Sequence, residues 1–147
     1  MKTKTIKQTA EFKVSPLQVY EALMDPKKHA KFTGESAKIN QKEGGSFSVY
    51  SGYASGKNIK LVPGKLIVQS WTTTDWPKGH YSEVIFEFQK SDHGTKMTFT
   101  QKDVPEANCA SIKDGWKDFY WKRMEEYFSS LLPKETKKIK PINKKQK

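Results

Sequence analysis

A run of aromatic residues near the C-terminus constrains the fold more than any other feature of this sequence. Between residues 112 and 131, apolar side chains recur at spacings of three and four, which is the pattern of one helix face. The stripe consists of Ile112, Trp116, Phe119, Tyr120, Met124, Tyr127, Phe128 and Leu131. So broad an apolar face must be covered, and the preceding sequence offers mainly strands to cover it. We therefore expect one long C-terminal helix lying across a sheet.

The aromatic stripe is compatible with two arrangements. Its rings can fill the core, since large aromatic side chains dominate core packing. Alternatively, a curved sheet and a helix with bulky rings can enclose an apolar space, which is the usual form of a ligand site. The lining of such a cavity would come from Phe47, Trp71, Phe86, Phe99, Trp116, Tyr120 and Met124. The sequence leaves both arrangements open.

The remaining sequence predicts an α+β domain. Alternating apolar and polar residues over 3–14 predict a strand, and Ser15, Pro16 and Gln18 form the start signal of a helix. Asp25-Pro26 ends that helix and opens a second, shorter one that stops at Gly34. Short strand patterns separated by glycine or proline turns then follow, at residues 37–40, 46–50, 55–61, 65–73, 81–90 and 95–102.

Length, charge and cysteine content limit the class of protein. The 147 residues suit one domain, expected at 1–132, followed by a basic and disordered tail at 133–147. That tail carries seven lysines and one glutamate, so six of the eleven net positive charges lie there. A single arginine, Arg123, argues against nucleic-acid recognition.

A lone cysteine, Cys109, expected in the loop before the last helix, fits a reducing compartment. With no signal-peptide or membrane-span pattern, we expect a cytoplasmic protein.

Several short motifs, taken together with the element order, resemble one known family. The order of strand, two short helices, about six strands and a long helix resembles the helix-grip fold of START-like proteins. The motifs are Gly44-Gly45-Ser46-Phe47, Gly52, Ser55-Gly56, Leu61-Val62-Pro63, Trp76-Pro77-Lys78-Gly79-His80, Val104-Pro105 and Gly115-Trp116. They occur in the order seen in the activator of heat-shock protein 90 (Hsp90) ATPase homologue family. Over roughly residues 4–132, the sequence is most similar to the C-terminal domain of the eukaryotic activator.

The resemblance implies a function that needs no catalysis. It implies a co-chaperone-like protein that binds Hsp90 and stimulates its ATPase, with a helix-grip fold and no cofactor. The alternative, from the cavity interpretation, is a carrier or sensor of a small hydrophobic molecule held between the sheet and the last helix. An enzyme is not expected, because Cys109 has no neighbouring histidine and Glu83 and Glu87 fall on the outer face of their strand.

One loop is the candidate contact site for a partner. Trp76, Lys78 and His80 lie between two predicted strands, and an exposed Trp would suit an interface. The alternative is that Trp76 folds back to close one end of the sheet and that His80 has only a structural role. The preceding run from Thr72 to Asp75 is either a strand end or the polar mouth of a pocket. We expect no metal site, because no other histidine stands at a ligand-like spacing from His80.

Overall fold

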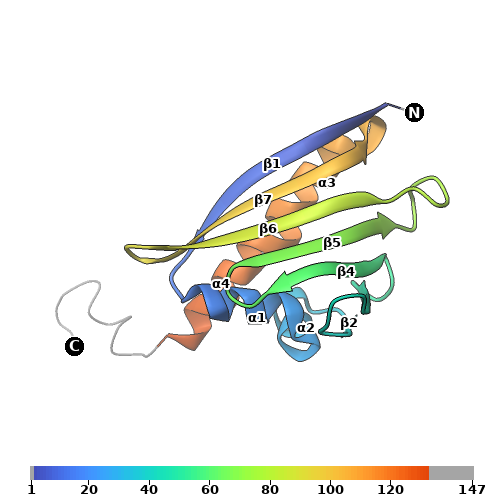
Figure 1. Cartoon of the computed structure of the whole chain (residues 1–147). Helices are drawn as coiled ribbons and strands as arrows, with labels where there is room; N and C mark the ends of the chain where they lie inside the picture. Colours follow the sequence, from blue (N-terminus) through green and yellow to red (C-terminus); the bar gives the residue numbers. More distant parts are fainter. Residues whose placement is uncertain (1, 133–147) are drawn as a thin grey trace, which may run out of the picture.

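The computed structural model describes residues 2–132, which form a curved antiparallel sheet crossed on one face by a long helical segment (Figure 1). The tail at 133–147 lies outside the described residues. The elements in chain order are β1 (Thr3–Phe12), α1 (Pro16–Met24), α2 (Pro26–Thr33), β2 (Lys38–Ile39), β3 (Ser46–Val49), β4 (Ala54–Val62), β5 (Leu66–Thr73), β6 (Ser82–Ser91), β7 (Gly94–Pro105), the 3₁₀ turn η1 (Glu106–Asn108), α3 (Cys109–Trp116), the π-helical η2 (Lys117–Trp121) and α4 (Lys122–Leu131). This architecture confirms the predicted α+β, helix-grip fold.

The seven strands are ordered β1-β7-β6-β5-β4-β3-β2. Strands β2 to β7 form a meander, and β1 joins the sheet at the β7 edge, with Phe12 opposite Thr95. The two helices α1 and α2 carry the chain from the β1 edge to the β2 edge (Figure 1). On the way, α1 packs against β6 and β7, and α2 packs against α4.

The first two helices begin and end where the sequence predicted. The Ser15 hydroxyl accepts from the backbone N–H of Gln18, and the Gln18 side chain accepts from the backbone N–H of Ser15. Asp25 serves both helices, because its backbone N–H donates to the last turn of α1 and its carboxylate accepts from the first turn of α2. Gly34 ends α2 in the left-handed conformation, at φ 76°.

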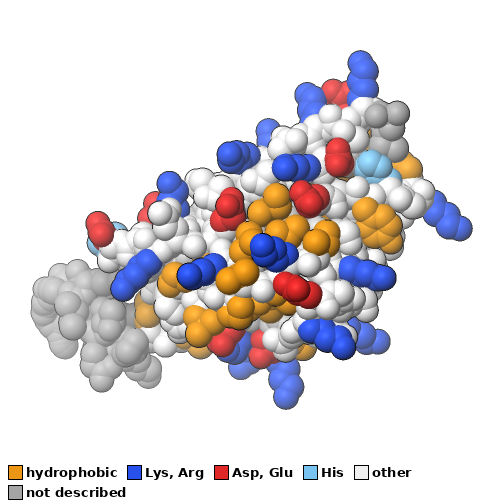
Figure 2. Space-filling model, viewed as in Figure 1, with side chains coloured by type: hydrophobic (Ala, Val, Ile, Leu, Met, Phe, Trp, Pro, Cys, Tyr) orange, Lys and Arg blue, Asp and Glu red, His pale blue; other side chains and the backbone are white. Residues whose placement is uncertain are grey.

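The inner face of the sheet follows the predicted alternation. Val84, Phe86 and Phe88 of β6 and Met97 and Phe99 of β7 are all buried, with Phe86 and Phe99 against Trp116 of the last helix and Phe88 against Tyr20 of α1. The hairpin between these strands pairs Ser91 with Gly94, as the turn signal indicated. The outer face keeps half-buried apolar residues such as Val68 and Ile85, which pair across β5 and β6. Figure 2 shows hydrophobic side chains gathered over the middle of this face among lysines and acids.

The last helix differs from the single regular helix that the sequence predicted. It begins earlier, so Cys109 is the buried first residue of α3 and does not lie in the preceding loop. Its middle turn is the π-helix η2. A π-turn inserts one residue, which rotates the following positions around the axis. As a result Trp121, absent from the predicted stripe, is buried, whereas Phe119 and Leu131 are about half exposed.

Close approach of β4 and β5 explains one of the glycines. A Cβ atom built on Gly56 would lie 1.8 Å from the backbone oxygen of Ser70. Neither strand can yield without breaking pairing. In α3, by contrast, a Cβ on Gly115 would meet nothing closer than 4.0 Å.

We predict opposite effects of alanine at these two glycines. Gly56→Ala should lower the free energy of unfolding by about 2 kcal/mol or more, because backbone must move. Gly115→Ala should raise it by about 1 kcal/mol, because alanine favours a helix. Urea unfolding followed by circular dichroism measures both. Equal effects of the two substitutions would contradict the β4–β5 packing described above.

Candidate functional site

A pocket of about 510 Å³ lies where the last helix passes the ends of β3, β4 and β5. Its size is that of a small-molecule site. Six of its fourteen lining residues are aromatic: Tyr50, Tyr53, Trp71, Trp116, Phe119 and Tyr120. Glu35, Asp75 and Arg123 provide the charged groups of the lining. The pocket therefore combines an apolar body with a few charged positions at its edge.

Three of the seven residues predicted to line a ligand cavity reach this pocket. They are Trp71, Trp116 and Tyr120. Phe47 and Phe86 instead border a deeper void of only about 10 Å³, which is room for about one water molecule. Phe99 and Met124 are wholly buried and border neither space. Side chains thus fill the region between the centre of the sheet and the helix, and the open space lies at one end.

The filled region is a cluster of tightly packed, mutually tilted rings. Trp116 lies 4.4 Å from Phe99, 4.6 Å from Tyr120 and 4.9 Å from Trp71, measured between ring centroids. Its indole N–H donates to the buried Gln101 side chain at 2.8 Å. Because the hydrogen bond and the ring contacts together hold its side chain in one position, Trp116 forms a fixed wall of the pocket.

Behind Tyr120 lies a buried histidine. The Tyr120 hydroxyl is 2.9 Å from Nε2 of His29, and both residues are almost fully buried. Burial lowers the pKa of His29 to about 4 and raises the pKa of the Tyr120 phenol well above its usual value. Both groups are therefore neutral at physiological pH. Nδ1 of His29 has no hydrogen-bond partner among the described residues.

The turn between β3 and β4 positions the polar edge of the pocket. Tyr50 and Ser51 both adopt left-handed backbone angles, with φ of 52° and 54°. The Tyr50 hydroxyl donates to the backbone carbonyl of Phe119 in η2, and the Ser51 hydroxyl donates to the Glu35 carboxylate at 2.9 Å. Burial raises the pKa of Tyr50 to about 12, so its hydroxyl remains a donor. These contacts tie the turn to both the helix and the end of α2.

The other charged residues of the pocket have local partners. Asp75 accepts hydrogen bonds from the hydroxyls of Tyr53 and Thr73. The guanidinium of Arg123 donates to the backbone carbonyl of Thr33 at 2.6 Å and lies 5.1 Å from the centre of the Phe119 ring. The run from Thr72 to Asp75 was predicted to be either a strand end or the polar mouth of a pocket, and it is both. Strand β5 ends at Thr73, and Thr73 and Asp75 line the pocket.

Most of this polar edge was missed by the sequence analysis. Glu35, Tyr50, Tyr53 and Arg123 belong to a turn, a short connection and a helix surface, and no motif links them. The one available signal was the paired tyrosines that flank Gly52, at a turn that the glycine already marked.

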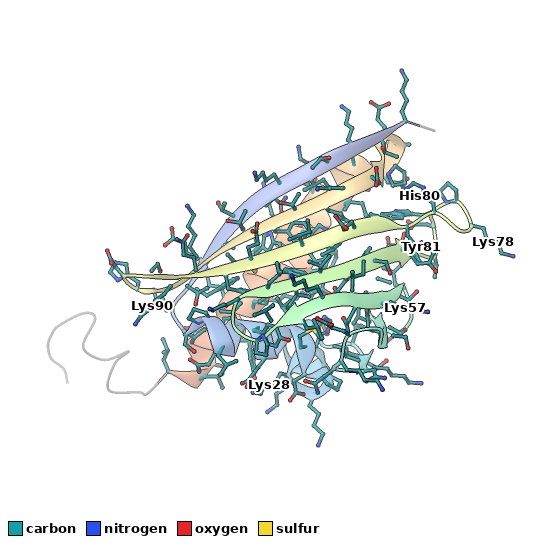
Figure 3. The ribbon with its side chains drawn as sticks, in the orientation of Figure 1. Lys28, Lys57, Lys78, His80, Tyr81 and Lys90 are labelled. Atoms are coloured by element: carbon teal, nitrogen blue, oxygen red, sulfur yellow. The ribbon has the colours of Figure 1, made fainter. Side chains whose placement is uncertain are left out.

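The predicted contact loop has a buried and an exposed part. Trp76 is 6% exposed and packs edge-to-face against His80, at a centroid distance of 5.8 Å. Nε2 of His80 donates to the backbone carbonyl of Asp103 at 2.7 Å, so the histidine links the loop to the end of β7. Lys78 is exposed and lies at the outer end of the loop (Figure 3). A role of these three residues in partner contact stays a prediction.

The described residues offer no arrangement typical of a metal centre, because no three His, Cys, Asp or Glu side chains gather among them. Within residues 2–132, no helix has the length and apolar character needed to cross a membrane. Cys109 is a free thiol that is buried at the start of α3.

A seven-stranded sheet wrapped along a long C-terminal helix, with a pocket at one end, defines a helix-grip protein. The family described as "Activator of Hsp90 ATPase homolog 1-like protein" matches residues 13–129. The chain belongs to this family. This confirms the resemblance drawn from the sequence motifs.

Individual relatives agree with the family. The chain is 34% identical over 128 residues to a protein of Dictyostelium discoideum named "Activator of 90 kDa heat shock protein ATPase homolog". The match covers 86% of this chain and 33% of that protein. A second relative, from Mus musculus and named "Activator of 90 kDa heat shock protein ATPase homolog 2", is 25% identical, with 80% of this chain and 35% of the relative covered. The chain thus spans about a third of the length of these relatives.

Solved structures show the same fold. An HSP90 activator from Plasmodium falciparum superposes with a TM-score of 0.78 at 27% identity, covering 85% of this chain and 96% of that one. A Mesorhizobium loti protein superposes with a TM-score of 0.76 over 88% of this chain and all of that one, but at 16% identity. This second likeness supports the fold alone.

We predict that His29 makes stability depend on pH. Its folded pKa, about 4, lies below its ordinary value of 6.5, so the unfolded chain takes up this proton first as the pH falls. The resulting loss of stability starts near pH 6.5, reaches about 2 kcal/mol by pH 5 and ends near pH 4. His29→Gln can still bond to Tyr120 but does not titrate. Urea unfolding at pH 7 and pH 5 should show the smaller loss in His29→Gln. Parallel losses in the two proteins would rule out His29 as the source.

Proposed function

We propose that this protein is a non-enzymatic co-chaperone that binds Hsp90 and stimulates its ATPase. The observation that carries the proposal is membership of the Hsp90 activator homologue family over residues 13–129. Two relatives are themselves named as activators or their homologues, one from Dictyostelium discoideum and one from Plasmodium falciparum. The place of action would be the cytoplasm, where the Hsp90 partner would be met.

The proposed mechanism is selection of one chaperone conformation. A partner shifts an equilibrium only if it binds one state more tightly than the other. Stimulation of the ATPase therefore requires tighter binding to the closed, hydrolysis-competent state than to the open state. No catalytic group has to be supplied by this chain.

Charge supports the proposed encounter. The chain has a net charge of +11, and lysines are spread over the face of the described residues that Figure 2 shows. A basic protein associates faster with an acidic partner, and salt screens this attraction. Lys78 is suited to such a contact because it projects from the β5–β6 loop, whereas Lys90 projects from the opposite end of the sheet (Figure 3).

The decisive measurement is the steady-state ATPase rate of the Hsp90 from the same organism, with and without this protein. A saturable increase that weakens at raised salt supports the proposal. No change at saturating protein would refute direct activation by this chain alone.

We predict that charge reversal at Lys78 weakens the stimulation. Lys78→Glu should raise the concentration needed for half-maximal stimulation by about fivefold, because it replaces an attraction by a repulsion. Lys90→Glu makes the same charge change at the far end and serves as the control. Removing residues 133–147 should reduce the salt dependence, since six net charges are lost. Equal effects of the two reversals would show that the loop is not the contact. Trp76→Ala is less informative, because Trp76 is buried.

The pocket supports a second candidate function, a carrier or sensor of a small hydrophobic molecule. A volume of about 510 Å³ with six aromatic side chains in its wall fits such a ligand. The site differs in position from the predicted cavity, because rings fill the centre and the open space lies at the end of β5.

We predict that filling the pocket abolishes ligand binding without unfolding the protein. Ser111 is an exposed residue of α3 that lines the pocket, so Ser111→Trp places a large ring in the open space. Lys113→Trp adds the same ring at an exposed position of α3 that does not line the pocket and is the control. Fluorescence of the neutral dye Nile red should rise with the parent and Lys113→Trp but not with Ser111→Trp. Equal dye binding by all three would refute this site.

A further inference from the structure

We propose that the pocket at the end of β5 binds a small organic cation, a protonated or quaternary amine with apolar substituents. The inference rests on the second candidate function and names its ligand class. Three features of the pocket support it: the sign of its charge, the state of its one arginine and the nature of its wall.

The pocket is acidic in a basic protein. Its charged lining residues are Glu35, Asp75 and Arg123, which give two negative charges and one positive. The whole chain carries +11. Neither carboxylate forms an ion pair with another residue of the described chain. Glu35 accepts from the Ser51 hydroxyl, and Asp75 accepts from the hydroxyls of Tyr53 and Thr73. Both negative charges are thus held in place without being neutralised.

The one positive charge is already engaged. The Arg123 guanidinium donates to the Thr33 carbonyl and lies over the Phe119 ring. This arrangement fixes it between the end of α2 and η2. It forms no ion pair with either pocket carboxylate, although both line the same space. An incoming cation would therefore meet carboxylates that are still available to it.

The aromatic wall favours the same ligand class. Six aromatic residues line the pocket, and the faces of Trp, Tyr and Phe attract organic cations. Tyr53 and Phe119 are 41% and 48% exposed, so they form the mouth, while Trp71, Trp116 and Tyr120 form the buried floor. Rings around a cavity with carboxylates at its edge are the pattern that recognises alkylated ammonium groups.

Other ligand classes fit this lining less well. An anion would be repelled by Glu35 and Asp75. A neutral apolar ligand would displace water from two carboxylates without forming a hydrogen bond or an ion pair with them. A divalent metal ion needs several oxygen ligands at one point, and the described residues contain no such cluster.

The test compares two probes of the same shape that differ in charge. Choline and 3,3-dimethylbutan-1-ol share their shape, but a quaternary nitrogen in the first is a carbon in the second. Binding is followed by NMR of the indole N–H signals of Trp71 and Trp116, at constant ionic strength. Choline should bind about tenfold more tightly than the alcohol. Equal affinity for the two probes, or no response to choline at solubility-limited concentrations, would overturn the proposal.

Substitution of the two pocket carboxylates tests whether they cause the preference for choline over the alcohol. Glu35→Gln and Asp75→Asn keep oxygen acceptors for their hydroxyl partners but remove the charge. Each should weaken choline binding several-fold and leave the alcohol unaffected. Glu87→Gln, an exposed position on the outer face of β6, is the matched control and should change neither. Unchanged choline affinity in both pocket variants would overturn the role of the carboxylates.

Failure of this proposal is distinguishable from failure of the carrier function. Nile red binding that Ser111→Trp abolishes, together with no preference for choline, would retain a carrier of neutral ligands and reject the cation. Loss of both responses would reject both.

Discussion

The π-turn in the last helix is the constraint on which the rest of the structure depends. By inserting one residue at Lys117–Trp121, it directs Trp116, Tyr120 and Trp121 together toward the sheet. In a regular α-helix Trp116 and Tyr120, four residues apart, would share one face, but Trp121, five residues after Trp116, would point away from it. Trp116 and Trp121 stack at 5.5 Å, and each indole N–H reaches a glutamine of the sheet, Gln101 or Gln8. The register of helix against sheet is thus fixed by hydrogen bonds as well as by packing.

The same packing decides where the molecule is hollow. Because the rings of the π-turn occupy the centre of the sheet, the candidate pocket lies farther along, where β5 ends and the β3–β4 turn approaches the helix. The contact of Tyr50 with the carbonyl of Phe119 closes that end without filling it. His29 of α2 lies behind this wall, and its hydrogen bond to Tyr120 holds the wall against α2. Core and candidate site are therefore built from the same side chains.

Local signals in the sequence predicted what depends on local physics. The capping residues Ser15 and Gln18, the turn before Gly94 and the alternation in β6 each act within a few residues, and each was confirmed. The π-turn has no such signal, because a period of 3.6 residues was assumed for the whole stripe. The prediction was therefore wrong for Phe119 and Leu131 and missed Trp121. The polar edge of the pocket was equally out of reach, because Tyr50, Glu35 and Arg123 come to line one pocket only after the chain has folded.

The contact loop and the pocket share one segment of chain, which links the two proposed functions physically. Asp75 lines the pocket, Trp76 follows it into the core, and Lys78 projects from the loop two residues later. His80 then anchors the loop to Asp103. A ligand that contacts the Asp75 carboxylate would bind next to the same short loop that would contact the chaperone. If ligand binding moves the loop and so changes the affinity for the chaperone, then chaperone binding must change the affinity for the ligand by the same factor. The two proposed functions are then compatible, because both depend on the same loop.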